Sequence, residues 1–268
     1  MRFTKMQGLG NDYVYLDCTK ETPPDLPGLA VKVSDRHFGI GADGLICICP
    51  SGTADFRMRM FNADGSEGAM CGNGIRCVGK FVYDKSMTSK KRLSIETASG
   101  VKELDLHTED GKVAEVTVDM GIPEPDQSRI ITVYDKDYRI TPVSMGNPHA
   151  VLCVRGLEEL DLARLGPGFE RHPSFPGRTN TEFVEVCAPD RLRVRVWERG
   201  SGETLACGTG ACAALVASAL NGLCGREARV ELPGGTLHIR WEERDGHVYM
   251  TGPAVTVYEG VYDHGSDQ

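Results

Sequence analysis

Apolar and polar residues alternate in several short stretches of the chain, with the period of half-buried β-strands. Two of these stretches are residues 56–60 (FRMRM) and 192–196 (LRVRV). Further strand candidates are residues 14–16, 45–48, 93–97, 113–119, 150–154, 182–186, 226–232 and 236–241. Helices are expected at 75–85 and 211–221, and the second is almost wholly apolar (ACAALVASAL), so it should be buried. Because strands outnumber helices, the pattern predicts a sheet-rich α/β fold.

The two halves of the chain repeat each other when residues are shifted by 136 positions. Residues 56–74 (FRMRMFNADGSEGAMCGNG) align without a gap on 192–210 (LRVRVWERGSGETLACGTG). The same shift aligns Gly10-Asn11 with Gly146-Asn147 and Gly44 with Asn180, each time just before a strand-like run. One shift that serves three separated segments indicates two copies of one α/β unit. The seam is expected near residues 118–125, where GIPEPD supplies turn residues.

Composition and charge narrow the class of protein. Hydrophobic residues make up 40% of the 268 residues and charged residues 25%, which is ordinary for a globular protein with a buried core. The net charge of -8 argues against a nucleic-acid partner, since such proteins usually carry a basic face. No run of 18 apolar residues occurs, and the first residues contain no apolar run of signal-peptide length. We therefore expect a cytoplasmic protein with no membrane partner.

Ten cysteines need a separate explanation. Without a secretion signal, a disulfide scaffold is not expected. The chain also contains no CxxC pair and no Cys/His group with zinc-finger spacing, so no structural metal site is expected. Most of the cysteines, including Cys77 and Cys212 inside the expected helices, are interpreted as small packing residues. Cys71 and Cys207 differ, because each stands at a loop-to-helix junction in the repeated segment and is followed by glycines.

This position suits acid/base chemistry. The first N–H groups of a helix have no partner inside the helix, so they favour an anion and lower the pKa of a nearby thiol. Two such thiols at equivalent places in two repeated units imply a pair that faces a shared cleft. They could remove a proton from one face of a carbon and return one to the other, as in a two-base racemase or epimerase. The substrate carboxylate would bind the backbone N–H groups of Gly72, Asn73, Gly208 and Thr209. No pyridoxal-type lysine motif is evident, so no cofactor is expected.

Several motifs together resemble those of the diaminopimelate epimerase family. They are MCGNGIRC, GSGETLACGTGA, GNDYV, MGNPHAV, GIGADGL and RTNTEFVEV, spread over nearly the whole chain, and the two cysteine motifs are the most specific. The resemblance implies a cofactor-independent, homodimeric enzyme that interconverts LL- and meso-diaminopimelate in lysine and peptidoglycan precursor biosynthesis. It implies an α/β (α+β) fold of two pseudo-symmetric domains, each wrapped around a central helix. Their expected bounds are 1–118 plus about 253–268, where the last strand returns, and 119–252.

The resemblance also implies roles for individual residues. Cys71 and Cys207 resemble the acid/base pair, His149 and Glu198 the residues that tune the thiols, and Tyr258 a dimer contact. The positions that resemble substrate ligands are Asn11, Asn62, Gly72, Asn73, Asn147, Asn180, Glu198, Arg199, Gly208 and Thr209. No metal ligand is implied. The chain departs from the family at Gly44, where some members carry a glutamine ligand, so a contact there must be lost or made by the backbone.

The physical chemistry of the substrate agrees with this set. Diaminopimelate is a zwitterion at both ends, so its site needs donors for two carboxylates and acceptors for two ammonium groups. Asn62 and Glu198 are equivalent under the shift and would suit one reacting ammonium group. Arg199 could offer a forked contact to the distal carboxylate.

Other interpretations stay open on the sequence alone. The asparagines could be turn residues, His149 a structural loop histidine, and Glu198 with Arg199 an exposed ion pair. GIGADG (39–44) precedes a strand instead of a helix, and GTGACA (208–213) lies about ten residues after the preceding strand, which argues against dinucleotide binding. The nearer alternative is another cysteine-pair enzyme, such as a proline racemase-like one. A binding module that only holds an amino acid would need no thiol.

Overall fold

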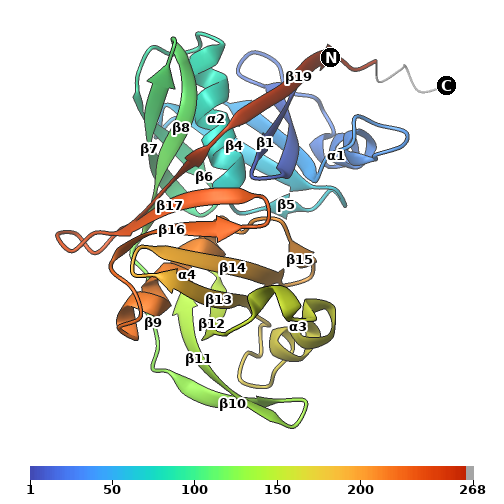
Figure 1. The fold of residues 1–268 in the computed structure, drawn as a ribbon. Helices are drawn as coiled ribbons and strands as arrows, with labels where there is room; N and C mark the ends of the chain where they lie inside the picture. The colour runs from blue at the N-terminus through green and yellow to red at the C-terminus, as the bar shows by residue number, and fades with distance from the viewer. Residues whose placement is uncertain (264–268) are drawn as a thin grey trace. The chain divides into compact units, whose positions relative to one another are not determined.

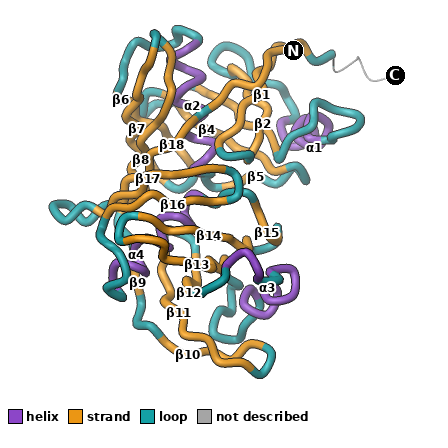
Figure 2. The backbone as a smooth tube through the Cα atoms, in the orientation of Figure 1, coloured by secondary structure: helices purple, strands orange, loops and turns teal. Residues whose placement is uncertain are grey.

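The computed structural model of the chain describes residues 1–263, and over this range strands greatly outnumber helices (Figures 1 and 2). The predicted sheet-rich α/β class is therefore confirmed. The chain forms two compact units, one of Met1–Val118 with the segment from Gly252 onward, the other of Asp119–Thr251. Each is described below by itself.

The first unit carries a long central helix and a shorter one among its strands. Its elements are β1 (Arg2–Gly8), β2 (Asn11–Asp17), α1 (Leu26–Ser34), β3 (Gly44–Cys49), β4 (Phe56–Asn62), β5 (Glu67–Gly68), α2 (Gly72–Asp84), β6 (Arg92–Thr97), β7 (Gly100–Glu109), β8 (Lys112–Gly121) and β19 (Val255–Val261). β19 pairs antiparallel with β1, and the N-terminal amine donates a hydrogen bond of 2.9 Å to the Tyr262 carbonyl. The end of the expected return segment, residues 264–268, lies outside the described residues.

The second unit repeats the order of strands and α-helices that runs from β1 to β8, and it adds two strands at its start and a 3-10 helix. It contains β9 (Glu124–Pro125), β10 (Arg129–Val133), β11 (Lys136–Ser144), β12 (Pro148–Cys153), the 3-10 helix Leu157–Glu159, α3 (Leu162–Glu170), β13 (Asn180–Ala188), β14 (Arg191–Glu198), β15 (Gly202–Thr204), α4 (Gly208–Leu220), β16 (Glu227–Leu232), β17 (Gly235–Trp241) and β18 (Val248–Pro253). The shift of 136 carries α1 onto α3 and α2 onto α4, residue for residue. It also relates the strand registers, since Tyr13 pairs with Gly44 as His149 pairs with Asn180. The internal repeat predicted from the sequence is therefore present in the secondary structure.

The predicted helices begin three residues too late. α2 begins at Gly72 and α4 at Gly208, directly after the two cysteines, whereas the apolar pattern suggested Ile75 and Ala211. The glycines of the first turn hide the helical pattern because glycine is a poor helix former. As a result, each cysteine is the N-cap of its helix.

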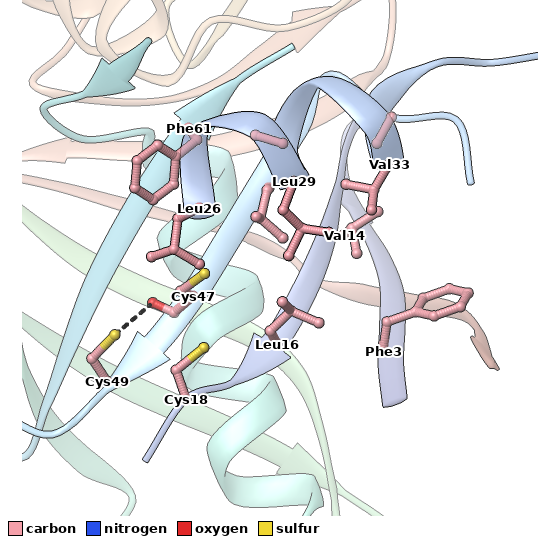
Figure 3. Close-up of a cluster of buried hydrophobic side chains, with 13 residues drawn as sticks. Phe3, Val14, Leu16, Cys18, Leu26, Leu29, Val33, Cys47, Cys49 and Phe61 are labelled. Atoms are coloured by element: carbon pink, nitrogen blue, oxygen red, sulfur yellow. Dashed lines mark hydrogen bonds between the residues drawn. The ribbon is translucent and has the colours of Figure 1, made fainter. Parts of the chain in front are cut away.

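A buried cluster between α1 and the neighbouring strands forms one core of the first unit (Figure 3). Leu26, Leu29 and Val33 of α1 belong to this cluster together with Cys47 of β3, in which all six residues are buried. Three cysteines, at 18, 47 and 49, pack inside this cluster. A hydrogen bond with the Cys47 side chain raises the pKa of Cys18 to about 12, which keeps this thiol protonated and inert. The packing interpretation is confirmed for these cysteines, and for Cys77 and Cys212, but Cys153 is exposed.

The second unit has its own core. Phe169 of α3 and Phe183 of β13 pack edge to face, with ring centroids 5.5 Å apart. α4 is buried along most of its length, as its uniformly apolar sequence predicts. Over residues 1–263, no helix is long and apolar enough to cross a membrane, and no cluster of potential metal ligands occurs.

Candidate active site

Cys71 lies at the start of α2 in a set of neutral hydrogen-bonding groups. Its sulfur accepts the Gly74 N–H at 3.3 Å, and its thiol donates to Oδ1 of Asn11 at 3.1 Å. The Asn11 amide is held in this direction because its Nδ2 donates to Asp43 at 2.8 Å. Asp43 therefore determines which end of the Asn11 amide meets the thiol.

An ion-pair network lies behind Asn11. Arg36 binds both Asp12 and Asp43 at 2.9 Å, and Lys5 pairs with Asp12 at 2.8 Å. Burial raises the pKa of Asp12, but the hydrogen bonds from Arg36 and Lys5 outweigh burial and hold it below its usual value. Asp12 is thus a carboxylate at neutral pH, and the network fixes the loop that carries Asn11.

Tyr13 fills the space next to Gly44. A Cβ atom at residue 44 would lie 2.1 Å from the Phe61 carbonyl oxygen and 2.9 Å from the Tyr13 ring. No side chain fits there without a backbone shift, so the glutamine ligand expected from the family resemblance has no room at this position. Burial, followed by the proximity of Cys71, raises the pKa of Tyr13, which keeps its hydroxyl protonated.

The other expected ligands of the first unit lie on the same elements. Asn62 ends β4, pairs in register with Gly44, and donates to Ser66 Oγ at 2.9 Å. Gly72 and Asn73 form the buried first turn of α2, next to Cys71. The first unit therefore brings Asn11 together with Cys71, whereas Asn62 lies on β4, which β3 separates from the Asn11 strand β2.

Cys207 occupies the equivalent position at the start of α4, but its surroundings are acidic. Its sulfur accepts the Gly210 N–H at 3.4 Å and lies 3.5 Å from the Thr209 hydroxyl. Burial, followed by the charges of Glu198 and Glu182, raises the pKa of Cys207 well above its usual value. The hydrogen bonds from Thr209 and Gly210 offset this only in part. The expected lowering of the thiol pKa is therefore wrong for Cys207, because burial and two carboxylates outweigh the end of the helix.

Glu198, at the end of β14, accepts a hydrogen bond of 2.5 Å from the Thr204 hydroxyl. Burial raises the pKa of Glu198, and the neighbouring Glu182 raises it further, while Thr204 and His149 act in the opposite direction. Glu198 is therefore a group able to hold a proton near Cys207 more readily than an exposed glutamate.

His149 and Glu182 form a fully buried pair beside Cys207. His149 Nδ1 lies 2.7 Å from Glu182 Oε1, and Nε2 lies 3.1 Å from Asn147 Oδ1. The sequence indicated His149 and Asn147, but Glu182 was missed. One signal was available: Glu182 is a charged residue at the start of an apolar strand, and its equivalent in the first half is Ile46.

Asn180 and Arg199 are joined through the backbone. Asn180 Oδ1 accepts the Arg199 N–H at 2.8 Å, and the Arg199 guanidinium donates to the Gly177 carbonyl at 3.0 Å. Glu170 supports the same turn, since it accepts hydrogen bonds from the Trp197 indole and the Gly200 N–H. Arg199 is exposed, so its remaining donors can reach an anionic ligand.

Cys71 and Cys207 occupy equivalent backbone positions, but the side chains around them differ in chemistry. The equivalent positions, first half and then second, are Asn11 and Asn147, Tyr13 and His149, Ile46 and Glu182, Asn62 and Glu198, and Asn73 and Thr209. In the first half these groups are neutral, whereas in the second half three of them can carry charge.

Tyr258 lies on β19. Its side chain is 43% exposed, and its ring packs edge to face on Phe3, with centroids 5.8 Å apart. The exposed part of the Tyr258 side chain is available to a partner, while its ring also contacts Phe3 within the chain.

Comparison with known proteins identifies the family. A family model described as diaminopimelate epimerase matches residues 3–124 and 141–257. The chain belongs to the diaminopimelate epimerase family. It is therefore an isomerase of the epimerase type. Diaminopimelate epimerase of Desulfovibrio desulfuricans is 57% identical over 282 residues, and that of Acetivibrio thermocellus is 55% identical over 276. Each alignment covers 98% of this chain, with 98% and 99% of the relative.

Solved structures of lower identity share the fold of this family member. A phenazine biosynthesis protein of the PhzF family from Bacillus anthracis matches with a TM-score of 0.75 and 18% identity, covering 97% of this chain and 98% of its own. A hydroxyproline epimerase from Agrobacterium vitis, with bound trans-4-hydroxy-L-proline, matches with a TM-score of 0.70 and 17% identity, covering 97% and 91%. At these identities the likeness concerns the fold alone.

Proposed function

We propose that the protein interconverts LL- and meso-diaminopimelate, with Cys71 and Cys207 as the acid/base pair. The observation that carries the proposal is that each cysteine is the N-cap of the central helix of its half, at equivalent positions of the repeat. The names of the relatives at 50–57% identity support the substrate. We propose that the two thiols act on opposite faces of one carbon of the substrate.

In the proposed reaction, one sulfur, as a thiolate, takes the α-hydrogen of the substrate as a proton. The other, as a thiol, delivers its own proton to the opposite face of the same carbon. The substrate gains one proton and loses one, so no oxidant, reductant or cofactor is needed. Backbone N–H groups at Gly72, Asn73, Gly208 and Thr209 would hold the α-carboxylate and stabilise the charge that develops on it.

The remaining polar residues would select the substrate. Glu198 and Asn62 would bind the reacting ammonium group, and Arg199 the distal carboxylate. We assign Asn11, Asn147 and Asn180 as further ligands, since each contacts a neighbour of this set through its amide. The tuning residues would be His149 and Glu198: Glu198 raises the pKa of the Cys207 thiol, and His149 acts in turn on Glu198. Proline has no second charged end, so these groups favour the longer substrate.

We further propose that the enzyme works in the cytoplasm as a homodimer, on the pathway to lysine and peptidoglycan precursors. Tyr258 would be part of the dimer contact. Support comes from β19, where Val255, Val257 and Val261 are 41%, 54% and 71% exposed next to Tyr258.

The deciding experiment is incubation of the purified, EDTA-treated protein with LL-diaminopimelate in D₂O, with proline as the control substrate. We expect meso-diaminopimelate to form, with deuterium at the inverted carbon by NMR, and proline to remain unchanged. Turnover of proline but not diaminopimelate would point to the proline racemase-like alternative. Inversion without deuterium uptake would contradict the thiol acid/base step.

A further inference from the structure

Glu182 is a buried carboxyl group to which the proposed reaction gives no role. Its side chain has no exposed surface, and its Oε1 lies at hydrogen-bond distance, 2.7 Å, from Nδ1 of His149. Among the described residues, its second oxygen, Oε2, has no hydrogen-bond partner. A buried carboxyl oxygen without a partner is costly, and groups of this kind need an explanation other than stability.

A chain of contacts leads from Glu182 to the sulfur of Cys207. From His149 it continues to Asn147 Oδ1, 3.1 Å from Nε2, and the Asn147 Nδ2 donates to the Thr209 hydroxyl at 3.3 Å. Because the Thr209 oxygen accepts this hydrogen bond, its own hydrogen is available to the Cys207 sulfur, 3.5 Å away. All the residues that form this series of contacts lie in the second unit.

Glu182 also lies directly below the first turn of α4. A Cβ atom on Gly210 would be 2.7 Å from Glu182 Oε1 and 3.2 Å from the Cys207 sulfur. In the first half, the equivalent contact is apolar, since a Cβ on Gly74 would meet the Ile46 side chain at 2.6 Å. The glycine at the third position of each helix thus makes room for a carboxylate in one half and for a hydrocarbon in the other.

Several groups from different elements act on Cys207. Glu198 of β14 and Glu182 of β13 are the acidic ones, and His149 of β12 pairs with Glu182 and also acts on Glu198. From α4, the Thr209 hydroxyl and the Gly210 N–H donate toward the sulfur. The two carboxylates raise the pKa of the thiol, and the two donors lower it.

We infer that Glu182 is a positioning residue for the reaction at Cys207. It holds the ring of His149 and, through Asn147 and Thr209, the hydroxyl that meets the sulfur, while its negative charge acts on the same sulfur. No proton passes along this series of contacts, because the proton exchanged with the substrate leaves and returns on the Cys207 sulfur. The inference rests on the proposed role of Cys207, and it makes the second half of the enzyme chemically distinct from the first.

The test measures how fast Cys207 reacts with iodoacetamide, a neutral reagent, at a fixed pH of about 8. Peptide mass spectrometry reports the rate at Cys207 relative to the exposed Cys153 of the same protein. Glu182→Gln keeps an oxygen for His149 but removes the charge, so the thiolate fraction should rise. We expect the relative rate to increase about tenfold, as for one unit of pKa. The matched control is Glu185→Gln on the same strand, which removes a charge that binds Gly156 and Arg193, and should leave the rate unchanged.

A second variant gives a shift of opposite sign. Thr209→Val removes the hydroxyl from the sulfur and leaves the buried pair in place, so the relative rate should fall several-fold, while Thr209→Ser should restore it. General loosening of the protein would change both rates in the same direction. A rate in Glu182→Gln equal to or below that of the wild type would overturn the inference. If Glu182→Gln does not fold, the inference would be overturned by a relative alkylation rate of Cys207 in Thr209→Val that equals or exceeds the wild-type rate.

Turnover separates this inference from the proposed function. In Glu182→Gln we expect kcat for LL-diaminopimelate to fall about tenfold with KM within about twofold, since no substrate contact is removed. A raised KM with unchanged kcat would overturn the positioning role. If the wild type does not turn over diaminopimelate, the proposed function fails, but the alkylation rates still test the link between Glu182 and Cys207.

Discussion

Glu182 and Gly210 are in such close contact that a single methyl group between them would displace a buried carboxylate. The Cβ of Gly210→Ala would lie 2.7 Å from Glu182 Oε1. We expect this variant to lose about 1–3 kcal/mol of unfolding free energy, as overpacked sites do. Gly74→Ala is the matched variant, and its Cβ meets the flexible end of Ile46, which can move. Urea unfolding should therefore show a smaller loss for Gly74→Ala, and equal losses would contradict the distinction.

Replacing either cysteine of the pair tests the mechanism. Cys71→Ala and Cys207→Ala should each reduce epimerisation at least about 100-fold, because each removes a positioned acid/base group. Circular dichroism and thermal unfolding should remain close to wild type. Cys153→Ala, at the exposed cysteine, is the control and should retain full activity. Near-normal turnover by either alanine variant would exclude the two-thiol mechanism.

Oxidation provides a second test of the pair. If both thiols act on one carbon, they should come close enough in the empty enzyme to form a disulfide with hydrogen peroxide, with the release of water. We expect reversible inactivation, protection by substrate, and a Cys71–Cys207 linked peptide in the mass spectrum of the inactivated protein. Inactivation without this peptide would count against the idea.

The network behind Asn11 predicts a pH dependence of stability. The pKa of Asp12 is lowered in the folded protein, below its ordinary value near 3.8. Its stabilising effect is therefore fully present above that value and is lost as the pH falls through the folded pKa. Asp12→Asn should cost about 1–3 kcal/mol at pH 7, and this difference from wild type should shrink below about pH 4. A difference independent of pH would show that the charge of Asp12 is not involved.

Asp43→Asn tests how the direction of the Asn11 amide affects Cys71. In the wild type, Asn11 Nδ2 donates to the Asp43 carboxylate at 2.8 Å. An amide at residue 43 binds this donor less strongly, so the Asn11 amide can turn. We expect kcat to fall about tenfold with little change in the melting temperature, because Asp43 is partly exposed. Unchanged kcat would mean that other contacts hold Asn11.

The strands, the internal repeat and the two cysteine-led helices could be predicted from the sequence. Alternating runs such as FRMRM and LRVRV predicted strands because the side chains of a strand point alternately to opposite faces. The 136-residue shift predicted two copies of one unit, and the glycines after Cys71 and Cys207 predicted helix starts, although the pattern put those starts three residues late. The repeat also indicated the asparagines at 11 and 147, because a matched pair is more informative than a single turn residue.

Only the tertiary structure decided what surrounds each sulfur. Helix position alone predicted a lowered thiol pKa at Cys207, yet Glu198 and Glu182, brought in from neighbouring strands, raise it. Glu182 went unnoticed because its importance depends on burial beneath Gly210 and contact with His149, which are 28 and 33 residues away along the chain. Local sequence determines periodicity and helix ends, since these depend on adjacent residues. The charge near a sulfur depends on which distant strands pack against it, and only the folded chain sets that.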